Sequence, residues 1–90
     1  MFGKDTFRCI VATGEESILT VEATFAVVPT TGGQLGILVD RAPFLAAIGS
    51  GTLVVRQHQQ NHLFTVSGGV AHLLDNVLTV LAASCAPKKS

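Results

Sequence analysis

Apolar side chains in this chain tend to recur at every second position, and this alternation restricts the fold more than any other feature of the sequence. Alternation with a period of two is typical of β-strands that bury one face, whereas an amphipathic helix repeats about every 3.6 residues. β-Branched residues, which favour strands, are also frequent. Gly, Asn, Asp or Pro interrupts the pattern about every eight to twelve residues, as in all-β sandwiches and barrels. We therefore expect an all-β fold with little or no helix.

These interruptions divide the chain into short stretches that we expect to be strands. Only Ala42–Ala47 would accept a single helical turn, and no internal repeat or linker divides the chain, so we expect one domain. The expected strands are Thr6–Ala12, Ile18–Glu22, Ala23–Val28, Gly36–Leu38, Phe44–Ala47, Gly51–Gln57, His62–Ser67, Gly69–Leu74 and Val77–Ala83.

A first hairpin can be predicted down to the pairing of its residues. One register puts four apolar side chains on the same face, and a slip by one residue would bring Arg56 among them, so burial selects that register. The predicted pairs are Gln57 with His62, Val55 with Phe64, and Leu53 with Val66.

A second hairpin is expected to turn at Asp75-Asn76, because Asp and Asn tolerate the positive φ that a two-residue turn needs. In this register Leu74 pairs with Val77. Gly68-Gly69 separates the two hairpins and suits a bend or bulge where a strand passes from one sheet to another. The expected inward face is Ala71, Leu73, Leu78 and Val80, and His72 is expected to face outward opposite Thr79.

Charged residues are sparse in the middle of the chain. Between Ala23 and Leu74 they are Asp40, Arg41 and Arg56. A surface that is depleted of charge and rich in apolar groups is typical of one that a partner covers. The six basic and six acidic residues balance, no basic patch is present, and Phe is the only aromatic residue type. Binding to nucleic acid is therefore not expected.

The stretch from Pro29 to Gly51 combines five glycines and two prolines with a short apolar run. Glycine allows positive φ and close backbone approach, and proline fixes φ, so the stretch predicts a backbone of defined shape. Its only charges, Asp40 and Arg41, are too few for paired-carboxylate catalysis, but they could form an exposed ion pair or orient a partner. We therefore expect a docking surface.

Three histidines leave an alternative open. A small β-barrel metal-dependent enzyme or a sugar-binding domain could use His58, His62 and His72. In the predicted register they do not share a face, and no acidic residue stands near them to orient a ligating ring. Cys9 and Cys85 lack a CxxC spacing, so neither a zinc site nor a disulfide framework is expected.

Neither a cofactor loop nor a membrane-spanning segment is expected. The glycines of Gly32-Gly33-x-x-Gly36 precede a strand and no Lys follows them, unlike those of a phosphate loop. No apolar run approaches the roughly 18 residues of a spanning helix. The N-terminal MFGKDTFR lacks the apolar core of a signal peptide. We expect a soluble protein that is made in the cytosol.

Several short motifs occur in a characteristic order and spacing. They are Thr13-x-Glu15, Pro29-Thr30, GGQLGILVDRAPFL at 32–45, Gly49-x-Gly51, FTVSGG at 64–69, and Asn76 followed by LTVLA at 78–82. On these motifs the chain resembles the epsilon subunit of F-type ATP synthases, called delta in mitochondria, over roughly residues 6–86. Each motif alone is weak, but their combination is quite specific.

The resemblance implies a ten-stranded, two-sheet β-sandwich, or flattened barrel, over residues 6–86, between an N-terminal arm (1–5) and a C-terminal tail (87–90). It implies a non-catalytic rotor subunit of the central stalk that links gamma to the membrane c-ring and couples ion flow to ATP synthesis. Such a subunit has no catalytic residues, cofactor or small-molecule substrate of its own. It is peripheral to the membrane without inserting into it, on the cytoplasmic face in bacteria.

In the family, one loop faces the c-ring, and it corresponds here to the segment from Gly33 through Pro43. The residues that the resemblance assigns to partner binding are Gly33, Gln34, Leu35, Gly36, Ile37, Asp40, Arg41, Ala42 and Pro43.

The chain departs from the family pattern within this loop. Gln34 stands where Glu is usual and Arg41 where His is usual, so the loop loses an acid and gains a permanent cation. We therefore expect the ring to offer Arg41 a carboxylate or a carbonyl-rich turn. Many members also carry a C-terminal helical hairpin that can inhibit ATP hydrolysis. The sequence stops at Ser90, so either the natural subunit is a short form or this sequence is part of a longer one; in both cases we expect these 90 residues to support coupling without that inhibition. Further departures are Val39, His72 and Ala83, which stand where many members have Pro, Glu and Asp.

Overall fold

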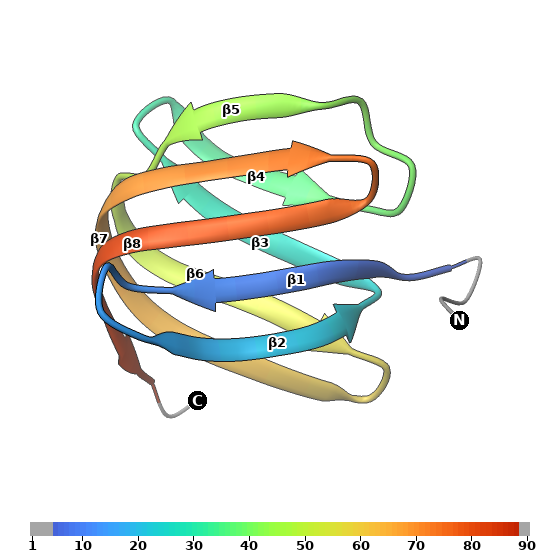
Figure 1. Cartoon of the computed structure of the whole chain (residues 1–90), viewed down its shortest axis with the longest axis horizontal. Helices are drawn as coiled ribbons and strands as arrows, with labels where there is room; N and C mark the ends of the chain where they lie inside the picture. Colours follow the sequence, from blue (N-terminus) through green and yellow to red (C-terminus); the bar gives the residue numbers. More distant parts are fainter. Residues whose placement is uncertain (1–4, 89–90) are drawn as a thin grey trace.

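The computed structural model describes residues 5–88, which form eight β-strands and no helix (Figure 1). The all-β prediction is confirmed. The strands are β1 (Phe7–Ala12), β2 (Ser17–Ala23), β3 (Phe25–Thr30), β4 (Gly33–Ile37), β5 (Phe44–Ala47), β6 (Ser50–Gln57), β7 (Gln60–Leu74) and β8 (Val77–Pro87).

Hydrogen bonds join these strands into one sheet that does not close on itself. Its order is β2-β1-β8-β7-β6-β3-β4, and β5 pairs with β7 beside this path. All pairs are antiparallel except β1 with β8, which run parallel. The first and last strands of the chain therefore lie side by side.

The sheet folds over into two layers because its two longest strands, β7 and β8, bend along their length (Figure 1). The first half of β7 pairs with β6 and its second half with β5. β8 follows β7, and its first half also pairs with β1. The β1 layer thus contains β1, β2, β5 and the adjoining halves of β7 and β8, and the β3 layer contains β3, β4, β6 and the other halves. The expected sandwich is confirmed, but ten strands become eight because β7 and β8 each serve both layers.

The bend in β7 lies at Gly68 and Gly69, whose φ angles are +72° and +108°. At Gly69 a side chain would place its Cβ 2.1 Å from the Leu81 carbonyl oxygen, so only glycine fits. The predicted bend is confirmed, but the expected strands on either side of it are one continuous strand. Backbone hydrogen bonds from Ile48 N to Gly69 O (2.9 Å) and from Gly68 N to Gly49 O (3.2 Å) continue the pairing from β5 to β6 across the bend.

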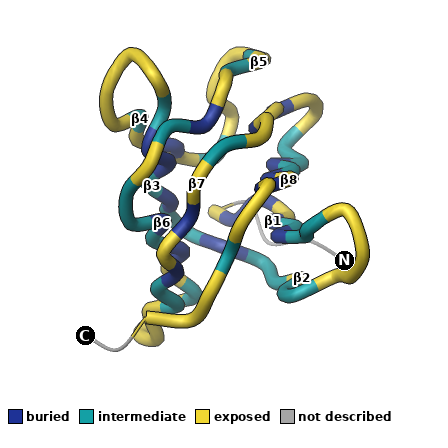
Figure 2. Tube along the Cα trace, turned by 90° about the vertical axis from the view of Figure 1, so that its left-hand side faces the viewer, coloured by how far each residue is buried: buried dark blue, intermediate teal, exposed yellow. Residues whose placement is uncertain are grey.

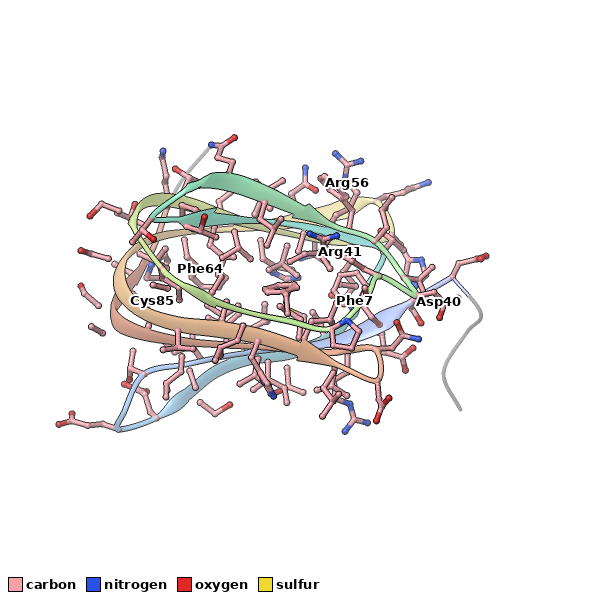
Figure 3. The ribbon with its side chains drawn as sticks, turned by 90° about the horizontal axis from the view of Figure 1, so that it is seen from above. Phe7, Asp40, Arg41, Arg56, Phe64 and Cys85 are labelled. Atoms are coloured by element: carbon pink, nitrogen blue, oxygen red, sulfur yellow. The ribbon has the colours of Figure 1, made fainter. Side chains whose placement is uncertain are left out.

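The core fills the space between the two layers, and its residues come from alternate positions of the strands that face each other (Figure 2). Figure 3 shows Phe7 and Phe64 between the layers. Burial raises the pKa of the Cys9 thiol to about 12, so it stays protonated at neutral pH. The buried apolar residues are Phe7, Cys9, Val11, Ala23, Ala26, Val28, Ile37, Ile48, Leu53, Val55, Phe64, Val66, Ala71, Leu73, Leu78, Val80 and Ala82.

The predicted register of the first hairpin is wrong by two residues. Gln57 pairs with Gln60, because the turn is a tight one at His58 and Gln59, with His58 at a φ of +55°. A shift by two residues leaves every side chain on its predicted face. The four side chains expected to face inward are accordingly all buried: Leu53, Val55, Phe64 and Val66.

The second hairpin is confirmed in register and in turn. Leu74 pairs with Val77, and Asp75 and Asn76 have φ angles of +52° and +60°. The predicted inward residues are at most 2% exposed. His72 is exposed and pairs with Thr79, as predicted.

Within residues 5–88 there is no helix long and apolar enough to cross a bilayer. Of the expected N-terminal arm, only Asp5 lies inside the described residues. The expected C-terminal tail starts with Pro87, which still belongs to β8, and the Lys88 backbone N donates a hydrogen bond to Leu63 O at 2.9 Å.

Candidate docking surface

The residues assigned to partner binding lie on two consecutive elements, the end strand β4 and the loop 38–43 that leads to β5. β4 follows β3 through a turn and pairs with it along its length. Ile37 is fully buried, so its side chain anchors β4 in the core and does not reach the surface. Leu35 is half-buried. The exposed members of the set are Gly33, Gln34, Gly36, Asp40, Arg41, Ala42 and Pro43.

Asp40 is held by Asn76 of the β7–β8 turn. The Asp40 backbone N donates to Asn76 Oδ1 at 2.7 Å, and Asn76 Nδ2 donates to Asp40 Oδ1 at 2.8 Å. The Asn76 carbonyl oxygen accepts a hydrogen bond from Arg8 N at 2.9 Å. Asn76 of the β7–β8 turn thus bonds both to the loop 38–43 and to β1. The Asp40 carboxylate, which could have paired with Arg41, bonds to the side-chain amide of Asn76 instead.

Replacing Asn76 with glycine should release this loop without straining the turn, because glycine accepts a φ of +60°. The loss of two side-chain hydrogen bonds should cost about 1 kcal/mol of stability. Hydrogen exchange followed by NMR should then show much faster exchange at the Asp40 amide. Asp75→Gly changes the same turn at a φ of +52° and is the matched control. Equal protection of the Asp40 amide in both variants would show that the side chain of Asn76 does not hold the loop.

Arg41 lies beside this anchor and packs over an aromatic ring. Its guanidinium carbon is 5.4 Å from the centroid of the Phe44 ring on β5, a cation–π contact. Arg41 also lines a groove of about 380 Å³, formed together with Phe25, Gly36, Leu38 and Val39.

A second exposed apolar area, missed in the sequence, lies on the outer face of the β1 layer. There β7 pairs Val70 with Leu81 of β8 and His72 with Leu45 of β5. Its signal in the sequence is that the second half of β7 has apolar residues on both faces, with His72 as the polar exception, and apolar residues on both faces are typical of a strand covered on both sides. We call it the outer strip; its members are Leu45 (74% exposed), Val70 (44%), Leu74 (51%) and Leu81 (46%).

The sequence of residues 6–88 matches the family described as the β-sandwich domain of the ATP synthase delta/epsilon chain. The chain belongs to this delta/epsilon family. The epsilon chain of Rhodopirellula baltica is 34% identical over 82 residues, which cover 91% of this chain and 64% of that protein. The epsilon chain of Maridesulfovibrio salexigens is 33% identical over 72 residues, which cover 80% and 51%. The chain therefore spans about half to two-thirds of the length of these relatives.

Two solved structures contain chains that share this fold. A chain in the mitochondrial ATP synthase of Euglena gracilis, determined as an OSCP/F1/c-ring assembly, superposes with a TM-score of 0.86 at 21% identity, covering 92% of this chain and 54% of that one. A chain in the central stalk and c-ring of the Tetrahymena thermophila mitochondrial enzyme superposes with a TM-score of 0.74 at 16% identity, covering 93% and 66%.

The histidines of this delta/epsilon-type domain do not come together. His58 is exposed in the β6–β7 turn, and His72 is exposed on the outer face of the β1 layer. His62 Nε2 lies 3.1 Å from Gln57 Oε1, within hydrogen-bond distance. Residues 5–88 contain no group of three or more His, Cys, Asp or Glu side chains that could hold a metal ion. The metal-dependent alternative therefore has no support in the structure.

Proposed function

We propose that this domain is a non-catalytic rotor subunit of the central stalk of an F-type ATP synthase, where it links gamma to the c-ring and couples ion flow to ATP synthesis. The match over residues 6–88 is the observation that carries this proposal, because the similar chains are ATP synthase epsilon chains. The structural neighbours come from assemblies with a c-ring, in keeping with these partners. In this role the domain is peripheral to the membrane, on its cytoplasmic face in a bacterium, and catalysis belongs to other subunits.

The two exposed areas suit two partners. We assign the loop 38–43 and the neighbouring face of β4 to the c-ring, because Asn76 and Phe44 hold this loop from both sides. A loop that is already ordered loses little entropy when it docks. We assign gamma to the outer strip, because an exposed apolar patch of this kind is typical of a surface that another protein covers.

Reversing the charge of Arg41 should weaken coupling. If the ring offers a carboxylate to this guanidinium, Arg41→Glu places like charges opposite each other, which costs several kcal/mol. The measurement is the ratio of ATP-driven proton pumping to ATP hydrolysis in vesicles that contain the reassembled enzyme. Lys88→Glu reverses an exposed charge directly after β8, outside the loop 38–43, and is the matched control. Unchanged coupling in the folded Arg41→Glu variant would contradict the assignment of this loop to the ring.

A further inference from the structure

Two arginines that are distant in the sequence lie near the Phe25 ring of the β3 layer: Arg56 packs over the ring, and Arg41 borders a groove that the ring lines. The guanidinium carbon of Arg56 on β6 is 5.8 Å from the centroid of the Phe25 ring on β3, and the two residues are a cross-strand pair. Phe25 also lines the groove that Arg41 borders. The sequence indicated neither Phe25 nor Arg56 as a site residue.

The groove that Phe25 lines and Arg41 borders is mostly apolar and open. The groove is open at Gly36 because glycine has no side chain. A Cβ there would lie 3.7 Å from the Phe25 ring, so a larger side chain at this position would fill the groove. Leu38 is 59% exposed at the same groove. An apolar side chain of a partner could therefore enter it and bury against Phe25 and Leu38.

Neither guanidinium is matched by a carboxylate within residues 5–88. Arg56 Nε donates to Asn61 Oδ1 at 3.2 Å, and Arg41 packs over Phe44. The neighbouring acid, Asp40, is bonded to Asn76. Guanidinium groups bind carboxylates through paired, charge-assisted hydrogen bonds, which are stronger beside an apolar surface than in water.

We propose that this groove docks an exposed loop of the c-ring that presents an apolar side chain next to a carboxylate. The apolar side chain packs on Phe25 and Leu38, and the carboxylate binds the guanidinium groups of Arg41 and Arg56. The proposal rests on the proposed function for the identity of the partner, and it adds Phe25 and Arg56 to the recognition of that partner. An anionic lipid surface fits less well, because such surfaces attract clusters of about four to eight cations, whereas here Arg41 borders the groove and Arg56 lies beside its Phe25 wall.

Chemical cross-linking can identify the partner carboxylate directly. Arg56→Lys keeps the cation but supplies an amine, which a carbodiimide joins to a carboxylate in direct contact. In the reassembled ATP synthase, mass spectrometry should find the lysine introduced at position 56 joined to an Asp or Glu of a ring subunit. Arg8→Lys places an amine on an exposed position of the β1 layer and should give no such product. A product with gamma alone, or no product in a complex that has assembled, would overturn the proposal.

Filling the groove provides an independent test. Gly36→Val should keep the fold, because the added Cβ makes ordinary contacts and valine suits a strand. We expect it, and separately Arg56→Gln, to weaken binding of the chain to the rest of its complex by about thirtyfold or more, as for truncation of one partner in a buried, charge-assisted pair. Gly14→Val, where a Cβ meets nothing within 4 Å, is the matched control.

The outcomes separate this proposal from the proposed function. If the unaltered chain does not bind the ring, the proposed function fails. If it binds, and both groove variants bind equally well, only the docking of the groove is refuted. The chain could instead bind vesicles of anionic lipid and lose that binding in Arg56→Gln. This result would identify a membrane, and not the ring loop, as the partner of the groove, and it would also refute the proposal.

Discussion

Gly69→Ala is expected to remove most of the stability of this domain. The added Cβ would lie 2.1 Å from Leu81 O and 2.9 Å from Ala82 Cα, and both are backbone atoms that cannot move away separately. The residue would also have to adopt a φ of +108°, which alanine rarely does. Strain and overpacking of this kind together cost about 3–5 kcal/mol. A domain of this length has only about 5–13 kcal/mol in total.

Urea or thermal unfolding followed by circular dichroism measures this effect. Gly14→Ala is the matched control, because a Cβ there meets nothing within 4 Å, and it should change stability by less than about 0.5 kcal/mol. A Gly69→Ala protein that unfolds cooperatively at the midpoint of the unaltered chain would show that β7 does not need glycine at its bend. It would then contradict the two-layer arrangement, because β7 passes between the layers at this point.

Truncation of Leu78 should have the second-largest effect. This residue is fully buried, and in the sheet it lies between Cys9 of β1 and Leu73 of β7. Leu78→Ala removes apolar contacts and leaves a cavity that neighbouring backbone cannot close, at a cost of about 2–5 kcal/mol. The variant should therefore unfold at a markedly lower urea concentration, with a similar dependence of its free energy on urea.

Leu81→Ala is the matched control for this experiment. Leu81 lies on the same strand, but its side chain faces outward and is 46% exposed. Its truncation should change stability by less than about 0.5 kcal/mol. Equal losses in the two variants would mean that the inward and outward faces of β8 have been assigned wrongly.

The alternation of side chains predicted which faces are buried better than it predicted which residues pair. In the first hairpin, a shift by two residues keeps Leu53 and Phe64 inward, so burial could not distinguish the predicted register from the observed one. The short turn at His58 decides the register, and histidine is not a strong signal for positive φ. The second hairpin was predicted correctly because Asp75-Asn76 is such a signal.

The candidate site was only partly visible in the sequence. Glycine, proline and the scarcity of charge indicated the segment around Arg41, because these are local properties of the chain. The bond between Asp40 and Asn76 joins residues that are 36 positions apart, and no local pattern reveals it. The contact of Arg56 with Phe25 depends in the same way on strand pairing.

The most direct test of the central proposal is purification of the chain together with the other subunits of its own ATP synthase. We predict that a tagged chain, expressed with gamma and the c-ring, brings down both, and that cross-links join its loop 38–43 to the ring and its outer strip to gamma. A folded chain that elutes alone and forms no cross-link with either subunit would contradict the proposed role in the central stalk.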